Sequence, residues 1–223
     1  TECVNEQVAM KGEGPKASIV INNYNYGCYV ADAIESALAQ TLGNVEIIVV
    51  DDLSTDNTRA VVAELATLYT KVRLIPLTEN SGTPARPRNI GVASARGAWI
   101  AYLDADDLWH PSKLELQMTV LAESGMSMCS SAMLDFSDEK EISYVHVPSS
   151  RPATTEISFR SQLVKYMTPT SSIVLRRDVA LQHPFPEDRK YRGREDFACI
   201  LGVHETIQKS VKIMFPLVYY RQH

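Results

Sequence analysis

The segment AWIAYLDADDLW, residues 98–109, joins an apolar run to three carboxylates within four positions. The apolar run predicts a buried strand, and in an extended backbone the side chains of Asp104 and Asp106 point to the same face. Asp107 would point to the opposite face unless the strand ends before it. Two like charges about 4 Å apart repel by roughly 4 kcal/mol at an effective dielectric constant of about 20. We therefore expect a positively charged group at this strand end.

Apolar runs and amphipathic segments alternate through the first half of the chain. Four runs rich in β-branched or apolar residues predict buried strands: 17–22, 45–51, 72–77 and 98–103. Helical spacing of apolar residues predicts four helices: 29–40, 54–69, 88–95 and 111–124. We expect Ser54 or Thr55 to cap the second helix and Pro111 to lie in the first turn of the fourth. The alternation indicates an α/β fold whose parallel sheet is covered on both faces.

The second half of the chain has a less regular pattern. It predicts strands at 126–136, 142–147, 171–177 and 211–220, a charged turn at 137–141, and helices at 157–167 and 194–208. We expect a flexible leader at residues 1–16 and one α/β domain over residues 17–223. We expect residues 17–109 to form a nucleotide-binding half and residues 110–223 to complete a cleft.

Composition narrows the class of protein. The chain has 223 residues, of which 45% are hydrophobic, and a net charge of −5, which is typical of a soluble globular protein and argues against nucleic acid as a partner. No run approaches the roughly 20 apolar residues that span a bilayer. The four cysteines are widely separated, so we expect reduced thiols in a cytoplasmic protein. The chain begins with Thr1, as a processed or excised form would.

Polar segments follow the four predicted strands of the first half, where open α/β sheets bind their ligands. They are NNYNYG (22–27), DDLSTDNT (51–58), TENSGTPARPRN (78–89) and DADD (104–107). The first three segments each have a structural alternative: a turn for the first, helix capping for the second, and ion pairs of Arg86 and Arg88 with acidic neighbours for the third. Asp52 fits equally well as a capping carboxylate or as an acceptor of hydrogen bonds from a nucleobase or ribose.

The acidic segment is the strongest indication of a ligand site. Carboxylate oxygens from Asp104 and Asp106 suit Mg²⁺ or Mn²⁺, which keep open positions that substrate phosphates fill. His110 is expected at the start of the next helix and not on the ion. The aspartates are therefore expected to hold a divalent ion, and the ion a diphosphate.

Four segments together resemble family 2 glycosyltransferases of the GT-A fold. They are SIVINNYN, VEIIVVDDLSTDNT, NSGTPARPRNIGVASARGAWIAYLDADDLW and GREDFACIL, in this order and spacing. The resemblance covers nearly everything after residue 16. It implies that Asn22 and Tyr24 contact the nucleobase, that Asp52 binds that base, usually uracil, and that Arg88 lines the nucleotide pocket.

The same resemblance implies the catalytic and metal-binding groups. Asp104 and Asp106 match the metal-binding DxD motif, and His223 is similar to a histidine that completes the metal site. Glu195 and Asp196 match the acidic pair from which the catalytic base is drawn. A structural alternative is that this pair only occupies the favourable first turn of a helix.

The implied reaction is inverting glycosyl transfer. Asp196 would remove the proton of an acceptor hydroxyl, which attacks the anomeric carbon as a nucleoside diphosphate leaves. The expected donor is a nucleotide-sugar, with a UDP-sugar favoured, and the acceptor is a glycan or lipid-linked molecule of bacterial surface polysaccharide synthesis. The expected cofactor is Mn²⁺ or Mg²⁺, and the expected location is the cytoplasm, at most peripherally on the inner face of the membrane. A catalytically inactive nucleotide-sugar-binding or scaffold domain is the alternative.

Two departures from the family pattern bear on these expectations. Asn22 and Asn23 stand where the family commonly has Pro-Thr, so contacts to the base would differ in detail. Family members normally continue beyond the residue matching His223, so a C-terminal truncation is an open alternative.

Two other enzyme classes fit the sequence less well. Aspartyl phosphatases place their DxD motif after the first strand, and dinucleotide-dependent dehydrogenases need GxGxxG at that position. This chain has neither motif after its first predicted strand.

Overall fold

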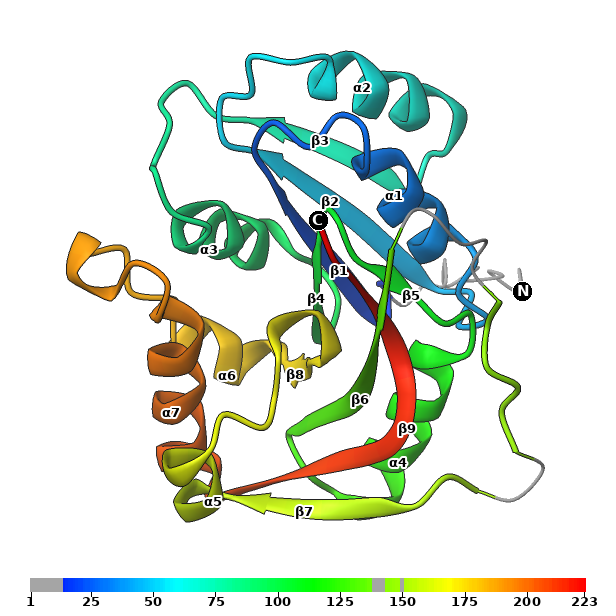
Figure 1. Cartoon of the computed structure of the whole chain (residues 1–223), viewed down its shortest axis with the longest axis vertical. Coiled ribbons are helices and arrows are strands. Elements are labelled where there is room, and N and C mark those ends of the chain that lie inside the picture. Colours follow the sequence, from blue (N-terminus) through cyan, green and yellow to red (C-terminus); the bar gives the residue numbers. More distant parts are fainter. Residues whose placement is uncertain (1–13, 138–142, 149–150) are drawn as a thin grey trace, which may run out of the picture.

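The computed structural model describes residues 14–137, 143–148 and 151–223, which form one mixed sheet of nine strands covered by helices (Figure 1). The sheet order is β3-β2-β1-β4-β8-β6-β9-β5, and β7 pairs with β9. The strands are β1 Ala17–Asn23, β2 Val45–Asp51, β3 Val72–Pro76, β4 Trp99–Asp104, β5 Leu108–Trp109, β6 Met128–Phe136, β7 Thr154–Ser158, β8 Val174–Arg176 and β9 Lys209–Arg221. The helices are α1 Val30–Leu38, α2 Thr58–Leu68, α3 Ala85–Ser94, α4 Lys113–Ser124, α5 Phe159–Val164, α6 Arg177–Gln182 and α7 Glu195–Ile207, with single 3₁₀ turns η1 Thr170–Ser172 and η2 Arg189–Tyr191.

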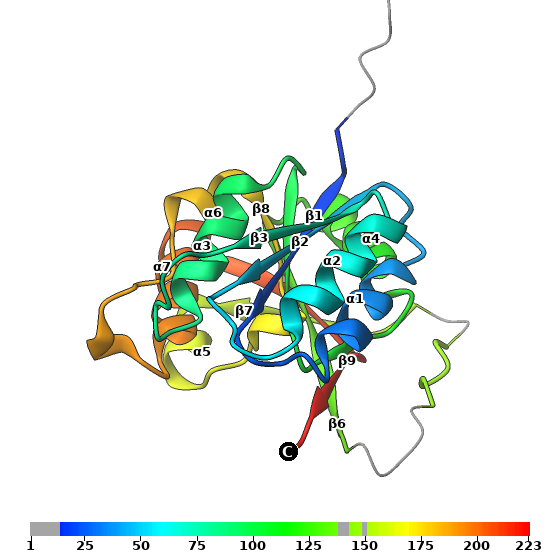
Figure 2. The ribbon, with the colours of Figure 1, turned by 90° about the horizontal axis from the view of Figure 1, so that it is seen from above.

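The first four strands form a parallel half-sheet buried on both faces. Side chains of β1 alternate, so Ile19 and Ile21 pack with α1, α2 and α4, whereas Val20 packs with α3, α6 and α7. Figure 2 shows these two helical layers on opposite sides of the sheet. The apolar runs are continuous because neither face meets water, which confirms the predicted α/β fold with a parallel sheet covered on both faces.

The strand register brings the polar strand ends together. Asn22 on β1 pairs with Asp104 on β4, and Asn23 pairs with Asp51 on β2. The carboxyl ends of these parallel strands therefore lie along one edge of the sheet, where the following loops begin.

The second half of the chain extends the sheet with mixed pairing. Strand β8 is antiparallel to β4 and β6, and β9 is parallel to β6 and antiparallel to β5 and β7. Leu108 of β5 pairs with Tyr219 of β9. The end of β9 thereby returns to the acidic turn that follows β4.

The structure confirms the predicted strands at 17–22, 45–51, 72–77 and 98–103 and the helices that follow them, with shifts of a few residues at the ends. Two predicted helix starts are wrong. Asn57 precedes α2 in place of Ser54 or Thr55, because the Ser54 hydroxyl accepts hydrogen bonds from Asn25 N and Asn23 Nδ2. Pro111 lies before the N-cap of α4, which begins at Lys113.

Other differences lie in the second half. Residues 143–147, predicted as part of a strand, form none, and Ile142 and most of the predicted turn lie outside the described residues. Short elements β5, β7 and α6 were not predicted, because runs this short carry little periodicity. The proposed boundary after residue 16 stays a prediction, and residues 1–13 lie outside the described part.

No helix of the described residues is long and apolar enough to cross a bilayer. Three cysteines within the described residues carry free thiols: exposed Cys28 and buried Cys129 and Cys199. Cys3 lies outside that part of the chain.

We expect Gly91→Ala to destabilise the fold, because Gly91 allows α3 to approach β1. A Cβ at this position would lie 2.3 Å from Cγ1 of buried Val20. Overpacking of this kind costs about 1–3 kcal/mol, which exceeds the gain of about 1 kcal/mol from replacing a helical glycine by alanine. Urea denaturation measures the change. Gly43→Ala is the control, since no atom lies within 4 Å of its added Cβ; equal midpoints for both variants would contradict the packing argument.

We expect His204 to weaken the fold at acid pH. His204 is fully buried between Ile200 O and the Ser210 hydroxyl, and burial lowers its pKa below the usual value. The unfolded chain therefore binds a proton below about pH 6.5 that the folded chain does not, and the free energy of unfolding falls as the pH drops through that range. Urea denaturation at pH 7.5 and pH 5 should show a smaller loss for His204→Gln than for the wild type. An identical loss in both proteins would refute the assignment.

Candidate functional site

Two adjoining cavities open at the carboxyl ends of β1, β2 and β4. The first cavity, of about 590 Å³, is lined by six of the residues predicted from the sequence: Asn22, Tyr24, Asp52, Arg88, Asp104 and Asp106. The second cavity, of about 520 Å³, is lined by both members of the predicted acidic pair, Glu195 and Asp196. Arg88, Asp104 and Tyr220 line both cavities, so the two spaces meet at these side chains.

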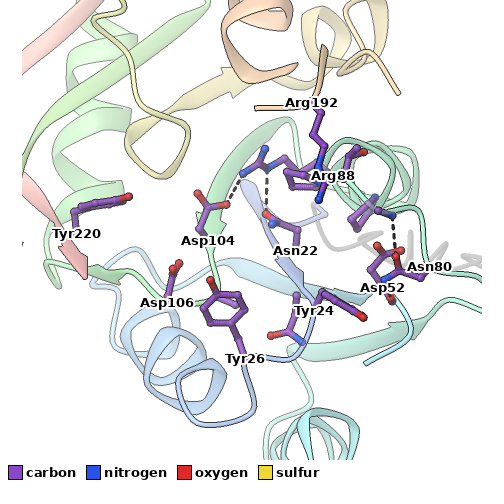
Figure 3. Close-up of a pocket in the computed structure, with 16 residues that line it drawn as sticks. Asn22, Tyr24, Tyr26, Asp52, Asn80, Arg88, Asp104, Asp106, Arg192 and Tyr220 are labelled. Carbon is purple, nitrogen blue, oxygen red and sulfur yellow. Dashed lines mark hydrogen bonds and ion pairs between the residues drawn. The ribbon is translucent and has the colours of Figure 1, made fainter. Parts of the chain in front are cut away.

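Asp52 forms one end of the first cavity (Figure 3). The buried carboxylate of Asp52 accepts hydrogen bonds from Ser81 N, at 3.0 and 3.1 Å to its two oxygens, and from Ser81 Oγ at 2.8 Å. The backbone carbonyl oxygen of Asp52 accepts a hydrogen bond from Asn80 Nδ2 at 2.8 Å. The side chain is therefore held by the loop after β3 and does not cap α2. Tyr24, 45% exposed, stands at the rim of the same cavity.

Arg88 forms the centre of the site. It lies in the first turns of α3, where Nη2 donates to Asp104 Oδ1 at 2.6 Å and Nε donates to Asn22 Oδ1 at 3.1 Å (Figure 3). The guanidinium also lies over the ring of Phe185 at 5.2 Å. Burial alone would lower the pKa of Arg88, but the Asp104 charge and the more distant Asp196 raise it above the usual value. Arg88 is the cation expected at this strand end.

The acidic turn, Asp104–Asp107, begins where β4 ends and is closed by a hydrogen bond from Asp107 N to Asp104 O at 3.1 Å. Asp104 and Asp106 both point into the first cavity (Figure 3). Because β4 ends at Asp104, the turn sets this arrangement and not the side-chain alternation of an extended strand from which it was predicted. Asp107 is buried and lines the second cavity instead. Burial, with the nearby charges of Asp104 and Asp106, raises the pKa of Asp107 to about 8.

The end of β9 and the residues after it supply two basic side chains to the acidic turn. Arg221 Nε donates to Asp106 O at 2.8 Å and Nη2 donates to Asp32 Oδ2 at 3.1 Å. The Arg221 guanidinium lies 4.5 Å from the centre of the Tyr29 ring. Two residues later, His223 Nε2 lies 3.0 Å from Asp106 Oδ2. Sequence reasoning identified His223 but missed Arg221, whose only signal is its place two residues before that histidine.

The second cavity surrounds the start of α7. Asp196 is half-buried there, and its Oδ1 accepts a hydrogen bond from Phe197 N at 2.7 Å. Glu195 is more deeply buried, and its Oε2 accepts from Arg194 N. Tyr166 faces this acidic pair: burial raises the pKa of Tyr166, and the Asp196 carboxylate raises it further.

The candidate metal ligands lie together only in part. Asp106 and His223 are in contact, whereas the nearest partner of Asp104 is Arg88. In the described part of the chain, no group of three or more His, Cys, Asp and Glu side chains is arranged to hold a metal ion.

Tyr26 reports the electrostatic potential beside these carboxylates. Burial raises the pKa of Tyr26, and the charges of Asp106 and Asp104 raise that pKa further, which indicates a negative potential on this side of the first cavity.

Several residues that line the first cavity were not identified from the sequence, among them Tyr26, Asn80, Arg192 and Tyr220. Tyr26 and Asn80 belong to strand-end segments that were recognised as a whole. Arg192 and Tyr220 lie close in sequence to Asp196 and His223, which the family resemblance identified, but no motif included Arg192 or Tyr220 themselves.

Comparison with known proteins gives the family. The family described as "Glycosyl transferase family 2" matches residues 18–182. An uncharacterised glycosyltransferase of Nostoc sp. is 33% identical over 213 residues, which are 93% of this chain and 65% of that protein. Escherichia coli WfaP, named UDP-Glc:alpha-D-GlcNAc-diphosphoundecaprenol beta-1,3-glucosyltransferase, is 30% identical over 207 residues, 92% of this chain and 77% of its own.

Solved structures agree on the fold. S. aureus TarS in complex with UDP-GlcNAc has a TM-score of 0.75 and 21% identity, over 93% of this chain and 59% of that one. The mannosyltransferase PcManGT from Pyrobaculum calidifontis, in complex with GDP-Man and Mn²⁺, has a TM-score of 0.68 and 18% identity, over 94% of this chain and 57% of that one. The chain thus spans less than two thirds of the length of these two proteins and of the Nostoc relative. On its sequence match and its architecture, the chain belongs to glycosyltransferase family 2 and has the GT-A fold.

Proposed function

We propose that the protein transfers a sugar, with inversion, from a nucleoside-diphosphate-sugar to a hydroxyl of a glycan or lipid-linked acceptor in bacterial surface polysaccharide synthesis. The observation that carries the proposal is the junction of the two cavities at Arg88, Asp104 and Tyr220. A donor in the first cavity and an acceptor in the second would meet there, with Glu195 and Asp196 on the acceptor side. A domain that only binds a nucleotide-sugar would not need a second cavity with a carboxylate in its wall.

The first cavity fits a nucleotide-sugar. Asp52 offers a fixed carboxylate for a nucleobase, Tyr24 offers a ring for stacking, and Asn22 lies between them and the acidic turn. UDP is the proposed nucleotide. This choice is supported by the name of WfaP and by the UDP-GlcNAc complex of TarS, whereas PcManGT binds GDP-Man.

The residues present fit a divalent cation that the substrate helps to hold. Asp104, Asp106 and His223 provide hard oxygen donors and one imidazole at the edge of the first cavity. Because Mg²⁺ and Mn²⁺ are often bound by one or two carboxylates together with substrate phosphates, a site that is incomplete without substrate is expected. When bound, the ion would neutralise charge on the diphosphate.

Asp196 is the proposed general base. It is half-buried at the wall of the second cavity, where a carboxylate can accept the proton of an acceptor hydroxyl. The hydroxyl oxygen forms a bond to the anomeric carbon while the bond from that carbon to the diphosphate oxygen breaks, and the nucleoside diphosphate leaves in the first cavity. Glu195 is held by Arg194 N and assists by fixing the start of α7.

Action at the cytoplasmic face of the membrane, with at most peripheral association, belongs to the same proposal. It is supported by the diphosphoundecaprenol acceptor in the name of WfaP. The alternative, an inactive domain that binds nucleotide-sugar, retains the first cavity but needs no base in the second.

The test of the proposed function is calorimetric titration of the protein with UDP, GDP, dTDP and CDP, each with and without Mn²⁺, followed by an assay of sugar transfer to glycan and lipid-linked acceptors. Metal-dependent binding of one nucleotide and release of that nucleotide on transfer are expected. Binding without any turnover would favour the inactive domain, and no binding would overturn both alternatives.

We expect Asp106→Asn to weaken Mn²⁺-dependent binding of UDP by about 10-fold or more, because a charged ligand of the ion is replaced by a neutral one. Calorimetry with and without Mn²⁺ measures the effect. Asp178→Asn, at an exposed ion pair with Arg176, is the control and should bind as the wild type does. An unchanged Mn²⁺ dependence in Asp106→Asn would remove the metal assignment.

We expect Asp196→Asn to leave UDP binding nearly intact and to reduce the rate of transfer by roughly 100-fold or more, since the amide cannot accept the proton. Calorimetry and a steady-state transfer assay measure the two quantities on one preparation. Loss of UDP binding in this variant would instead assign Asp196 a structural role.

A further inference from the structure

A tight turn precedes the acidic pair of α7 and carries an arginine at its corner. Arg194 N donates to Tyr191 O at 2.7 Å, which closes a four-residue turn. Arg192 has φ −51° and ψ 124°, and Gly193 has φ +73°. These are the angles of a type II turn, in which the third position needs a positive φ and favours glycine. The backbone at Arg192 is therefore set by local geometry.

The turn directs two neighbouring segments to different cavities. Arg192 lines the first cavity, and Figure 3 shows its side chain reaching into that cavity on the same side as Arg88. Gly193, Glu195 and Asp196 line the second cavity. A single reversal of the chain thus presents a cation to one space and carboxylates to the other.

The guanidinium of Arg192 has no counter-ion among the described residues. None of them forms a hydrogen bond or ion pair with its side chain. The three carboxylates of the first cavity each have another partner: Ser81 for Asp52, Arg88 for Asp104 and His223 for Asp106. Arg88 is buried at the centre of this cavity, and Arg192 is an exposed residue at its wall. An anion in the cavity would meet both guanidinium groups, whose planar donors match phosphate oxygens.

We infer that Arg192 binds the diphosphate of the ligand and makes the site select nucleoside diphosphates over monophosphates and nucleosides. The inference rests on the proposed function and adds a specificity-determining residue to it. The donor is the assigned source of the diphosphate, because Arg192 lines the first cavity and not the second. A diphosphate-linked acceptor is the other source that offers the same chemistry.

The test compares Arg192→Gln with Arg189→Gln. Arg189 lies three residues earlier and is exposed, as Arg192 is, but it lines neither cavity, so it controls for the loss of one charge. Calorimetry with UDP, UMP and uridine, each with Mn²⁺, measures the affinities. In Arg192→Gln we expect UDP to bind about 10-fold or more weakly, UMP to lose less, and uridine to bind as it does to the wild type. Arg189→Gln should match the wild type with all three.

A steady-state transfer assay identifies the source of the diphosphate. Donor assignment predicts a higher KM for the sugar nucleotide in Arg192→Gln and an unchanged KM for the acceptor. A higher KM for a diphosphate-linked acceptor alone, with unchanged UDP affinity, would overturn the donor assignment. Unchanged affinities and KM values would overturn the inference and leave the proposed function intact, whereas a wild-type protein that binds no nucleotide would overturn both. Arg192→Lys, which keeps the charge but not the planar fork, should fall between wild type and Arg192→Gln.

Discussion

The ion pair between Arg88 and Asp104 is the interaction on which the site depends. The guanidinium is 6% exposed and donates to Asp104 at 2.6 Å, whereas the carboxylate is 29% exposed toward the cavities. Removing one partner of such a pair leaves the other charge desolvated, which costs about 3–5 kcal/mol for fully buried pairs and less here. The pair also connects two layers, because Arg88 belongs to α3 and Asp104 ends β4. The geometry of the site at the edge of the sheet therefore depends on the close packing of α3 against the sheet.

The acidic turn also receives contacts from the second half of the chain. The carboxylates of the turn follow a strand of the first half of the chain, whereas two basic residues that contact the turn come from the end of β9 and the residues directly after it: Arg221 donates to the backbone oxygen of Asp106, and His223 contacts the Asp106 carboxylate. Strand β9 reaches that point because it pairs with β5 directly after the turn. The mixed sheet of the second half therefore does more than cover a core. It returns positive charge to a position that the parallel half makes strongly negative.

The sequence predicted the parallel half well because the relevant signals are local. A strand buried on both faces reads as a continuous apolar run, and the polar residues after each run mark the strand ends. Long-range pairing was not accessible in the same way. Arg221 contacts a backbone oxygen 115 positions away, and Ser54 leaves its expected capping role because Asn25 and Asn23, distant in sequence, donate to its hydroxyl. Both errors arise where a tertiary contact replaces a local one.

The two cavities differ in how firmly the fold holds them. Asp52 is fixed by three hydrogen bonds from Ser81, and Asn22 by its register with Asp104, so the first cavity is formed before a ligand arrives and little ordering entropy is lost on binding. The second cavity is lined from β6, the loop around Tyr166 and the turn before α7. Changes in such loops leave strand ends untouched. Under the proposed function, the strand-end part of the donor site can therefore stay the same while the acceptor changes, although the turn before α7 contributes Arg192 to the first cavity as well.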